Sequence, residues 1–300
     1  MNPPPTVSVV IPTYNRGKHI IETLDSVFAQ TFKSFELIVV NDGSTDDSAN
    51  VLGPLAKSGQ IHYIEQTNAG PAAARNRGLA EAKGEFVAFL DDDDLWPGDK
   101  LEWQFAALQG DPHLLAVYGS FTLLGKEHIK WVDFDTCPSG MIREELCRGN
   151  YVGSPGVALI RTGAIRAIHG FDVSLKGPED WDLWIRLSET GQSMFVNKTA
   201  LLYRVHEKSV SGDYWSMYTQ SMRVARKHYG SAGQRAQYLL ACAFIKTFVV
   251  NGYFETLHKS RRAGRMLQVL RCILMAALID PARVLRRLAD KFGLSPQSAR

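Results

Sequence analysis

Short apolar runs rich in β-branched residues alternate with helical patterns along the first part of the chain, and this alternation restricts the fold more than any other feature. Four runs have the composition of buried strands: Val7–Ile11, Phe35–Val40, Ile61–Ile64 and Phe86–Leu90. Between them, Lys18–Ala29 and Ala72–Ala82 place apolar residues at helical spacing, and Asp46 or Asp47 is suited to cap a further helix. Repeated strand–helix–strand units predict an α/β fold with a mainly parallel sheet covered by helices on both faces.

The rest of the chain divides into a mixed region and a helical region. Before residue 213 we expect strands at Leu114–Tyr118, Val157–Ile160, Met194–Val196 and Leu201–Val205, a helix at Glu179–Glu189, and irregular loops from Gly119 to Asn150. From Tyr214 onward the pattern predicts helices alone, at about 214–228, 232–250 and 256–290. The sequence therefore predicts a first domain at 1–213 and an α-helical C-terminal extension at 214–300.

Charge divides at the same boundary. Residues 1–213 contain 19 basic and 28 acidic side chains, whereas residues 214–300 contain 15 basic and 3 acidic ones, so net charges of −9 and +12 make up the overall +3. Such an asymmetry indicates that the two regions have different tasks.

Composition excludes several classes of protein. Apolar residues at 45% and charged residues at 22% are typical of a globular chain rather than a disordered or fibrous one. The four cysteines form no CxxC pair, which argues against a zinc ribbon or disulfide scaffold and suits a reducing compartment. No secretory signal is visible, and the longest apolar stretch, Tyr238–Val250, is shorter than the roughly 20 residues of a membrane span. We therefore expect a cytoplasmic protein.

The run Asp91–Asp94 directly follows the fourth predicted strand and carries the sharpest chemical signal. At about 5 Å separation and an effective dielectric constant near 20, each pair of carboxylates repels by roughly 3 kcal/mol. A solvated acidic loop tolerates this cost, but ligands of parallel sheets bind at the carboxyl ends of the strands. In an extended chain Asp91 and Asp93 face one way, and Asp92 and Asp94 the other. Two carboxylates at this spacing suit Mg²⁺ or Mn²⁺ bound together with a diphosphate.

Two further polar segments follow predicted strands. Asp42 lies in a turn after the second strand, where it serves either as a turn residue or as a contact to a nucleotide base or ribose. Gly70 begins a segment of small residues that allows close approach of a ligand. Arg75, one helical turn further on, is either an ordinary surface arginine or a guanidinium fork for phosphate or base oxygens.

Five segments in this order resemble the family 2 glycosyltransferases of the GT-A fold. They are VSVVIPTYNR, VVNDGSTDDS, NAGPAAARNRG, FLDDDD and GPEDWDLWIRL, and the resemblance covers about residues 5–210. It implies a GT-A catalytic domain at 1–213, with nucleotide-sugar binding at about 5–110 and the acceptor side at about 111–213. Members transfer a sugar from a nucleotide diphosphate donor, usually with inversion.

The resemblance also implies roles for matching residues. Positions that hold the nucleoside match Pro12, Tyr14, Asn15, Asp42 and Arg75, and with Gly70, Asp91 and Asp92 they form the expected donor-binding set. The expected metal set, for Mn²⁺ or Mg²⁺, is Asp91, Asp93 and His206, although a lone histidine is often a surface group.

Asp180 matches the family's catalytic base, and Glu179 beside it is the alternative base. Inverting transfer needs one base, because the attacking acceptor hydroxyl must lose a proton while the metal stabilises the diphosphate leaving group. Taken without the resemblance, either acid is also suited to cap the helix that follows. Trp181 and Trp184 on that helix are expected to pack in the core.

The basic C-terminal region intersperses arginines with apolar residues, as in Arg261–Leu274. A basic amphipathic helix within 256–290 suits the surface of an anionic membrane and would bring the site to a lipid-linked acceptor. Alternatively, its apolar face packs against the catalytic domain or against a second copy in a homo-oligomer. We expect no nucleic-acid partner, because no recognised binding module accompanies the charge.

These observations predict an inverting, metal-dependent glycosyltransferase that uses a UDP-sugar donor and a carbohydrate or lipid-linked acceptor at the inner face of the plasma membrane. The product is part of a polysaccharide, a glycolipid or a glycoprotein glycan. One alternative is a nucleotidyltransferase that makes the nucleotide sugar, although PTYNRGK lacks the usual glycine-rich loop. The other is a catalytically inactive, membrane-docked scaffold of the same fold, which would not need acids at Asp91, Asp93 and Asp180.

Overall fold

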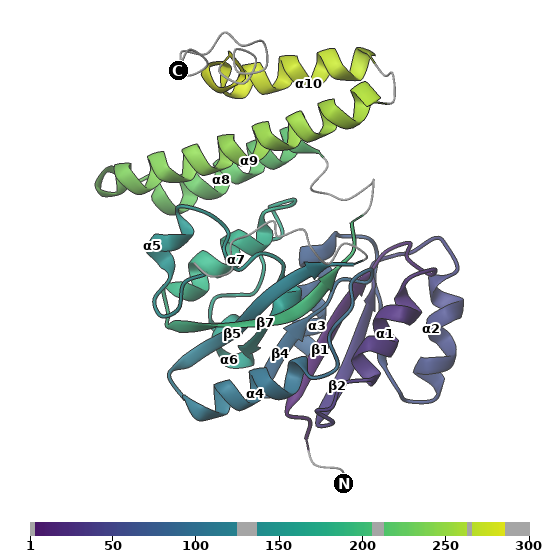
Figure 1. Cartoon of the computed structure of the whole chain (residues 1–300). Coiled ribbons are helices and arrows are strands. Elements are labelled where there is room, and N and C mark those ends of the chain that lie inside the picture. Colours follow the sequence, from purple (N-terminus) through teal and green to yellow (C-terminus); the bar gives the residue numbers. More distant parts are fainter. Residues whose placement is uncertain (1–3, 125–136, 206–212, 263–265, 286–300) are drawn as a thin grey trace. The chain divides into compact units, whose positions relative to one another are not determined.

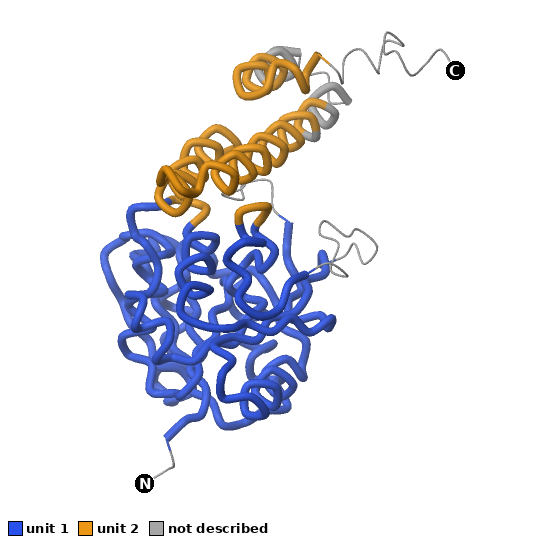
Figure 2. The backbone as a smooth tube through the Cα atoms, turned by 90° about the vertical axis from the view of Figure 1, so that its left-hand side faces the viewer, with its two compact units in different colours: residues 1–146, 150–175, 179–206 blue, residues 147–149, 176–178, 207–300 orange. Residues whose placement is uncertain are grey.

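A computed structural model describes residues 4–124, 137–205, 213–262 and 266–285. The chain forms two compact units (Figure 2). The first unit contains residues 1–146, 150–175 and 179–206, and the second contains residues 147–149, 176–178 and 207–300.

The first unit is built on a seven-stranded sheet with the strand order β3-β2-β1-β4-β6-β5-β7 (Figure 1). The strands are β1 (Val7–Thr13), β2 (Phe35–Asn41), β3 (His62–Glu65), β4 (Phe86–Phe89), β5 (Leu114–Leu123), β6 (Ala158–Arg161) and β7 (Gln192–Tyr203). β1 to β4 pair in parallel, β5 and β7 pair in parallel, and β6 runs antiparallel to both β4 and β5. The predicted mixed, mainly parallel sheet is therefore confirmed.

Helices flank this sheet, as predicted. They are α1 (Ile20–Phe28), α2 (Ser48–Lys57), α3 (Pro71–Glu81), α4 (Lys100–Gly110), α5 (Arg143–Leu146), α6 (Thr162–Ala167) and α7 (Glu179–Ser188), with a 3-10 turn at Pro155–Val157. α3 packs closely on β1 and β2. At Gly78 of α3, a Cβ atom would lie 2.3 Å from Cγ1 of Val10, so glycine allows the helix to approach the strand. This close packing fixes the position of the arginine that α3 carries toward the strand ends.

The register of the parallel strands brings their polar ends to one edge of the sheet. Thr13 at the end of β1 is paired with Asn41 at the end of β2, and Val10 of β1 is paired with Phe89 at the end of β4. The segments that follow β1, β2 and β4 therefore meet at the same edge. This edge is where an α/β sheet binds its ligands.

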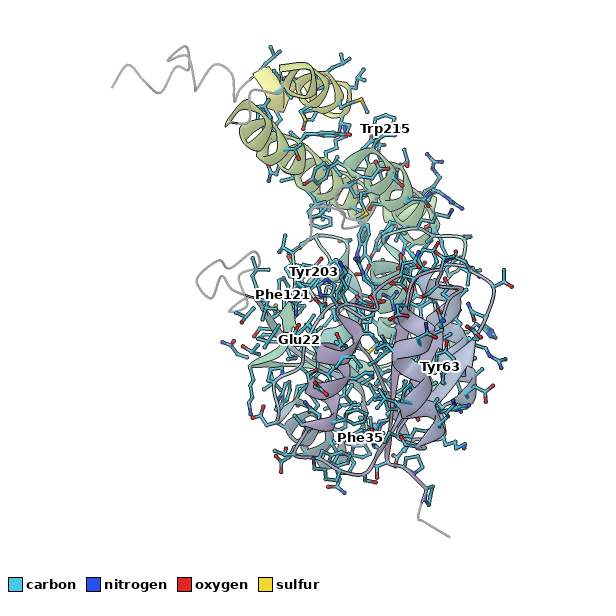
Figure 3. All side chains as sticks on the ribbon, turned by 90° about the vertical axis from the view of Figure 1, so that its right-hand side faces the viewer. Glu22, Phe35, Tyr63, Phe121, Tyr203 and Trp215 are labelled. Carbon is cyan, nitrogen blue, oxygen red and sulfur yellow. The ribbon has the colours of Figure 1, made fainter. Side chains whose placement is uncertain are left out.

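Several elements differ from the sequence predictions. The two short strands expected at 194–196 and 201–205 are one strand, β7, and β5 extends to Leu123, into the segment expected to be irregular. β5 and β7 stay paired through shifts of register near Ser120, and Phe121 packs against Tyr203 with ring centroids 6.0 Å apart (Figure 3). Pairing between distant strands thus overrides a locally polar sequence. The sequence pattern also predicts no element at 100–110, where α4 lies.

The second unit is helical. It contains α8 (Tyr214–Tyr229), a 3-10 turn at Ala232–Gln234, α9 (Arg235–Arg262) and α10 (Met266–Ile279), and both α8 and α10 pack against α9. As predicted, no strand occurs among the described residues from 213 onward. The break expected near residues 250–256 is wrong, because α9 continues through it, while α10 ends just before Asp280 and Pro281. No helix in the described parts of the chain is both long and apolar enough to cross a bilayer.

Candidate active site

The loop after β1 is tied to the loop after β2 through Asn15. Its backbone has a φ of 55°, in the left-handed region that asparagine tolerates better than most residues. The Asn15 side-chain oxygen accepts hydrogen bonds from the backbone N–H groups of Thr45 at 2.7 Å and Asp46 at 3.2 Å. The Asn15 N–H donates to the Ser44 hydroxyl at 3.0 Å. Asn15 therefore shapes this edge, and its expected contact with a nucleoside stays a prediction.

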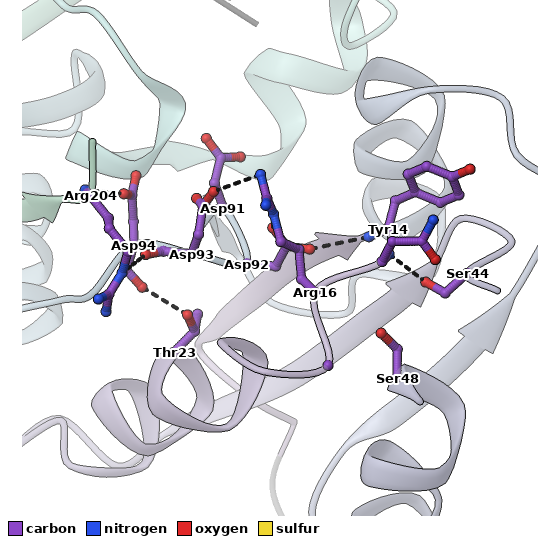
Figure 4. A network of polar contacts seen from close by, with 12 residues as sticks. Tyr14, Arg16, Thr23, Ser44, Ser48, Asp91, Asp92, Asp93, Asp94 and Arg204 are labelled. Atoms are coloured by element: carbon purple, nitrogen blue, oxygen red, sulfur yellow. Dashed lines mark hydrogen bonds and ion pairs between the residues drawn. The ribbon is translucent and has the colours of Figure 1, made fainter. Parts of the chain in front are cut away.

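Two other residues of the expected nucleoside set lie on the same strand and loop. Pro12 is buried within β1, and the ring of Tyr14 is exposed beyond its end. The Tyr14 N–H donates to the carboxylate of Asp92 at 3.1 Å (Figure 4). Its backbone thus helps to hold the aspartate run, while its ring is accessible to a ligand.

Asp42 holds the segment that leads into α3. Its carboxylate is 3% exposed and accepts hydrogen bonds from the Gln66 side chain at 2.7 Å and from the N–H groups of Ala69 at 2.9 Å and Gly70 at 2.8 Å. Gly70 precedes α3 with a φ of 90°, which disfavours any other residue. The structure gives Asp42 a positioning role that the sequence pattern does not predict.

Arg75 connects three distant segments at the centre of the site. Its guanidinium donates to Asp91 at 2.6 Å and to Glu179 at 3.1 Å, and it lies 5.3 Å from the ring centroid of Phe171. The side chain is 7% exposed, so Arg75 is not a surface arginine. Burial acts to lower its pKa, but the two carboxylates outweigh burial and raise the pKa above its usual value. A permanently charged arginine therefore joins the end of β4 to the start of α7.

The four aspartates do not alternate as the sequence analysis expects. The N–H of Asp94 donates to the carbonyl of Asp91 at 3.2 Å, so the segment is a turn rather than an extended strand. Asp92 and Asp93 lie beside Arg16 (Figure 4) and pair with it at 3.7 and 3.2 Å, whereas Asp91 pairs with Arg75. The prediction that Asp91 and Asp93 face the same way, opposite to Asp92 and Asp94, is therefore wrong.

Burial also rules out a freely solvated acidic loop. Asp92 and Asp94 are buried, and burial raises the pKa of both, with Asp93 adding to the shift at Asp92 and Asp91 at Asp94. The pKa of Asp92 rises to about 7. Asp94 accepts a hydrogen bond from the N–H of Arg204 at 2.8 Å. These two aspartates are therefore fixed by the fold at the edge of the sheet where the strands end.

Asp180 and Glu179 lie side by side at the start of α7 but have different environments. Glu179 is buried in its ion pair with Arg75. Asp180 accepts hydrogen bonds from the Trp181 N–H at 2.6 Å and the Asn150 side chain at 3.3 Å. Burial, and then the charge of Glu179, raise the pKa of Asp180 to about 7. A carboxyl group with such a pKa can accept a proton near neutrality.

The predicted metal ligands have the oxygen donors that a divalent cation prefers, but the described residues do not form a complete coordination site. Within the described residues, no group of three or more His, Cys, Asp and Glu side chains is placed to hold a metal, and His206 lies outside those residues. Asp91 and Asp93 offer hard oxygen donors and are only partly exposed. Arg16 and Arg75 together pair with four carboxyl groups, so carboxyl groups outnumber guanidinium groups in this set. Mg²⁺ is commonly held by one or two carboxylates plus substrate phosphates, and this donor set suits that arrangement.

Arg16, Arg204 and Asn150 contact the predicted acids, although the sequence analysis assigns them no role. The available signals were their positions in the sequence: Arg16 ends the segment PTYNR, and Arg204 lies within the predicted strand Leu201–Val205. Trp181 and Trp184 are buried in the core as predicted, and their indole N–H groups donate to the carbonyls of Leu146 and Gly153.

Comparison with protein families gives one matching model. The Glycosyl transferase family 2 model matches residues 8–168, which include the ends of β1, β2 and β4. TuaG of Bacillus subtilis, a glycosyltransferase assigned to teichuronic acid biosynthesis, is 30% identical over 74% of this chain and 88% of its own. The Escherichia coli UDP-Glc:alpha-D-GlcNAc-diphosphoundecaprenol beta-1,3-glucosyltransferase WfaP is 29% identical over 83% of this chain and 94% of its own.

Some relatives are much longer than this chain. An uncharacterized glycosyltransferase of Rickettsia bellii is 30% identical over 72% of this chain, which spans 31% of the length of that relative. The chain spans 17% of the length of a similar Rickettsia felis protein, with which it is 47% identical over 34% of its own length.

Two solved structures share the fold. S. aureus TarS 1-349 in complex with UDP-GlcNAc has a TM-score of 0.58 and 20% identity, covering 91% of this chain and 91% of that chain. The mannosyltransferase PcManGT from Pyrobaculum calidifontis, in complex with GDP-Man and Mn²⁺, has a TM-score of 0.65 and 18% identity, covering 99% of this chain and 83% of that chain.

Proposed function

The chain belongs to glycosyl transferase family 2, and from its site we propose that it transfers a sugar from a UDP-sugar to a hydroxyl group of the acceptor, with inversion. The observation that carries this proposal is the bridge made by Arg75. It places the aspartate run that suits a metal–diphosphate beside the acidic start of α7, which suits a base. The groups proposed to bind the donor and the group proposed to activate the acceptor therefore lie in the same site.

The donor lies against the edge formed by the ends of β1, β2 and β4. The exposed ring of Tyr14 and the segment that Asp42 holds form the nucleoside side, with Pro12, Asn15 and Gly70 fixing the backbone there. Asp91 and Asp92 lie toward the ribose and diphosphate. A UDP-sugar is favoured because TarS was solved with UDP-GlcNAc and the name of WfaP specifies UDP-Glc.

Asp93 and Asp91 would hold Mn²⁺ or Mg²⁺ together with the diphosphate, and His206 is a further proposed ligand. The Mn²⁺ complex of PcManGT supports a divalent ion. When bound, the ion stabilises the negative charge that develops on the leaving diphosphate. Arg75 and Arg16 keep the surrounding carboxylates in place.

Asp180 acts as the base in this proposal. Its raised pKa, about 7, suits removal of a proton from the acceptor hydroxyl as that oxygen attacks the anomeric carbon. Glu179, the alternative base, forms a buried ion pair with Arg75 and is therefore less suited to accept the proton. Its ion pair instead orients Arg75.

The acceptor is a carbohydrate, and the name of WfaP, which specifies a diphosphoundecaprenol-linked acceptor, supports a lipid-linked one. We place the product in polysaccharide or glycolipid synthesis at the cytoplasmic face of the membrane. Acceptor contacts come from the part of the first unit after about residue 110.

Calorimetric titration with UDP, dTDP, GDP and CDP, each with Mn²⁺ and with EDTA, tests the donor. We expect UDP to bind with Mn²⁺ and to lose most of its affinity in EDTA or in Asp93→Ala. Asp180→Asn should bind UDP normally and show no transfer of sugar, because only the base is lost.

Normal turnover by Asp180→Asn would overturn the base assignment. Binding of another nucleotide in preference to UDP would overturn the donor. Release of pyrophosphate from a sugar phosphate and a nucleoside triphosphate would instead show a nucleotidyltransferase.

A further inference from the structure

Helix α10 and the short helical segment at 281–285 that follows it carry both buried and exposed apolar residues. Cys272, Ala276 and Ile279 are buried, at the spacing of one helical face. Leu274 and Leu278 are 61% and 65% exposed on the opposite face of α10, and Leu285, in the helical segment that follows, is 67% exposed. We call these three leucines, with the exposed Pro281 and Ala282 between them, the α10 outer face.

The α10 outer face includes no charged residue from Leu274 to Leu285, and Arg271, three residues before Leu274, adjoins it in the sequence. Between Leu274 and Leu285 the charged residues are Asp280 and Arg283, which pair with each other at 3.7 Å. An exposed apolar stripe on a helix often marks a surface that another molecule covers. α9 packs against one side of α10, and among the described residues nothing covers the leucines of the other side.

The charge of the surrounding sequence indicates which partner this is. Residues 256–300 contain 10 basic and 2 acidic side chains. A second copy placed face to face would bring together two segments with the same sign of net charge, which repel each other. An anionic surface with an apolar interior complements both the leucines and the charge.

The length of α10 fixes how it can lie. Its 14 residues extend about 21 Å at 1.5 Å per residue, less than the roughly 30 Å hydrocarbon core of a bilayer. A helix of this length lies in the plane of the membrane with its apolar face toward the acyl chains.

We propose that the α10 outer face binds to the surface of a membrane that contains anionic lipids, with Leu274, Leu278 and Leu285 inserted among the acyl chains. This inference deepens the proposed function, since a lipid-linked acceptor is confined to such a surface. It can be tested without any transfer reaction, so its failure is distinguishable from failure of the proposed activity.

The test is flotation of the full chain with vesicles of phosphatidylcholine, with and without phosphatidylglycerol. The variant Leu274→Gln/Leu278→Gln removes apolar surface from the outer face but keeps charge and helix propensity. Leu239→Gln is the matched control, because Leu239 is 59% exposed on α9 of the same unit. Binding of UDP, by calorimetry, and circular dichroism report that each variant is folded.

We expect the wild type to float with the phosphatidylglycerol vesicles and to bind at least tenfold more weakly to phosphatidylcholine alone. The double variant should lose at least tenfold in binding to the anionic vesicles, and Leu239→Gln should keep it. Equal binding by the double variant, or no wild-type binding, would overturn the proposal. So would light scattering that shows a wild-type dimer converted to a monomer by the double variant, because a second copy would then cover the face.

Discussion

Replacing Arg75 by methionine should destabilise the first unit strongly, because it removes a buried positive charge from between two carboxylates. Glu179 is buried and Asp91 is 30% exposed by its side chain. Removing one partner of a buried ion pair costs about 3–5 kcal/mol. Because Asp91 is partly solvated, we take the lower end, about 3 kcal/mol. For a unit of this size, this lowers the Tm by about 6–12 °C.

The chain offers a matched control on the same helix. Arg77 pairs with Glu81 at 3.1 Å, but its side chain is 51% exposed. A solvated pair one turn apart on a helix contributes about 0.3–0.5 kcal/mol, so Arg77→Met should lower the Tm by about 1–2 °C. Thermal unfolding followed by circular dichroism at neutral pH measures both variants.

A second variant isolates the buried charge as the cause. Arg75→Met/Glu179→Gln removes the carboxylate that Arg75→Met leaves without its arginine, and should recover at least about 1 kcal/mol, or roughly 2–4 °C. If Arg75→Met and Arg77→Met lower the Tm equally, or if the double variant is no more stable than Arg75→Met, the electrostatic reasoning is refuted.

Other predictions concern pH and packing. With the pKa of Asp180 raised to about 7, kcat/KM should be about tenfold below its plateau one pH unit under that value. Because the folded state binds this proton more tightly than the unfolded state, wild-type stability contributed by Asp180 is lost as pH rises through 7, so Asp180→Asn should have the higher Tm above that pH. Burial lowers the pKa of Lys100, so wild-type Tm should rise with pH in the alkaline range, and Lys100→Met should flatten that rise. Gly78→Ala should cost about 1–3 kcal/mol in denaturant unfolding by overpacking against Val10, and Val10→Ala in the same chain should recover part of this loss.

Local sequence patterns predicted the first half of the sheet well, because a few consecutive residues are enough to indicate each of these strands and helices. β1, β2 and β4 are runs of buried residues, and α1 and α3 begin within two residues of the positions that apolar spacing indicates. β7 was predicted as two strands, Met194–Val196 and Leu201–Val205, which the polar residues Asn197–Thr199 separate in the sequence. Its continuity depends on pairing with β5, more than 70 residues earlier, which no local pattern contains.

The candidate site shows the same limit at the level of side chains. Acids at the ends of strands could be predicted, since parallel strands bring their carboxyl ends together. Their partners could not be predicted, because Arg75 reaches Glu179 across 104 residues and Asp42 binds backbone groups 27 and 28 residues away. An extended chain would place Asp91 and Asp93 on one side, but the turn at Asp91–Asp94 brings Asp92 and Asp93 to the same guanidinium group, that of Arg16.

The excess of acids in this site argues for function rather than stability. Arg16 and Arg75 pair with Asp91, Asp92, Asp93 and Glu179, and buried Asp94 adds a further carboxyl group. Well-packed apolar residues at such positions are often as stabilising as buried ion pairs, or more so. A cluster that keeps more carboxylates than guanidinium groups is therefore costly to fold around unless another positive charge joins it. A divalent ion that arrives with a diphosphate supplies that charge only in the complex. On this argument, binding of UDP with Mn²⁺ should raise the Tm of the wild type by more than UDP alone, and the added increment should disappear in Asp93→Ala.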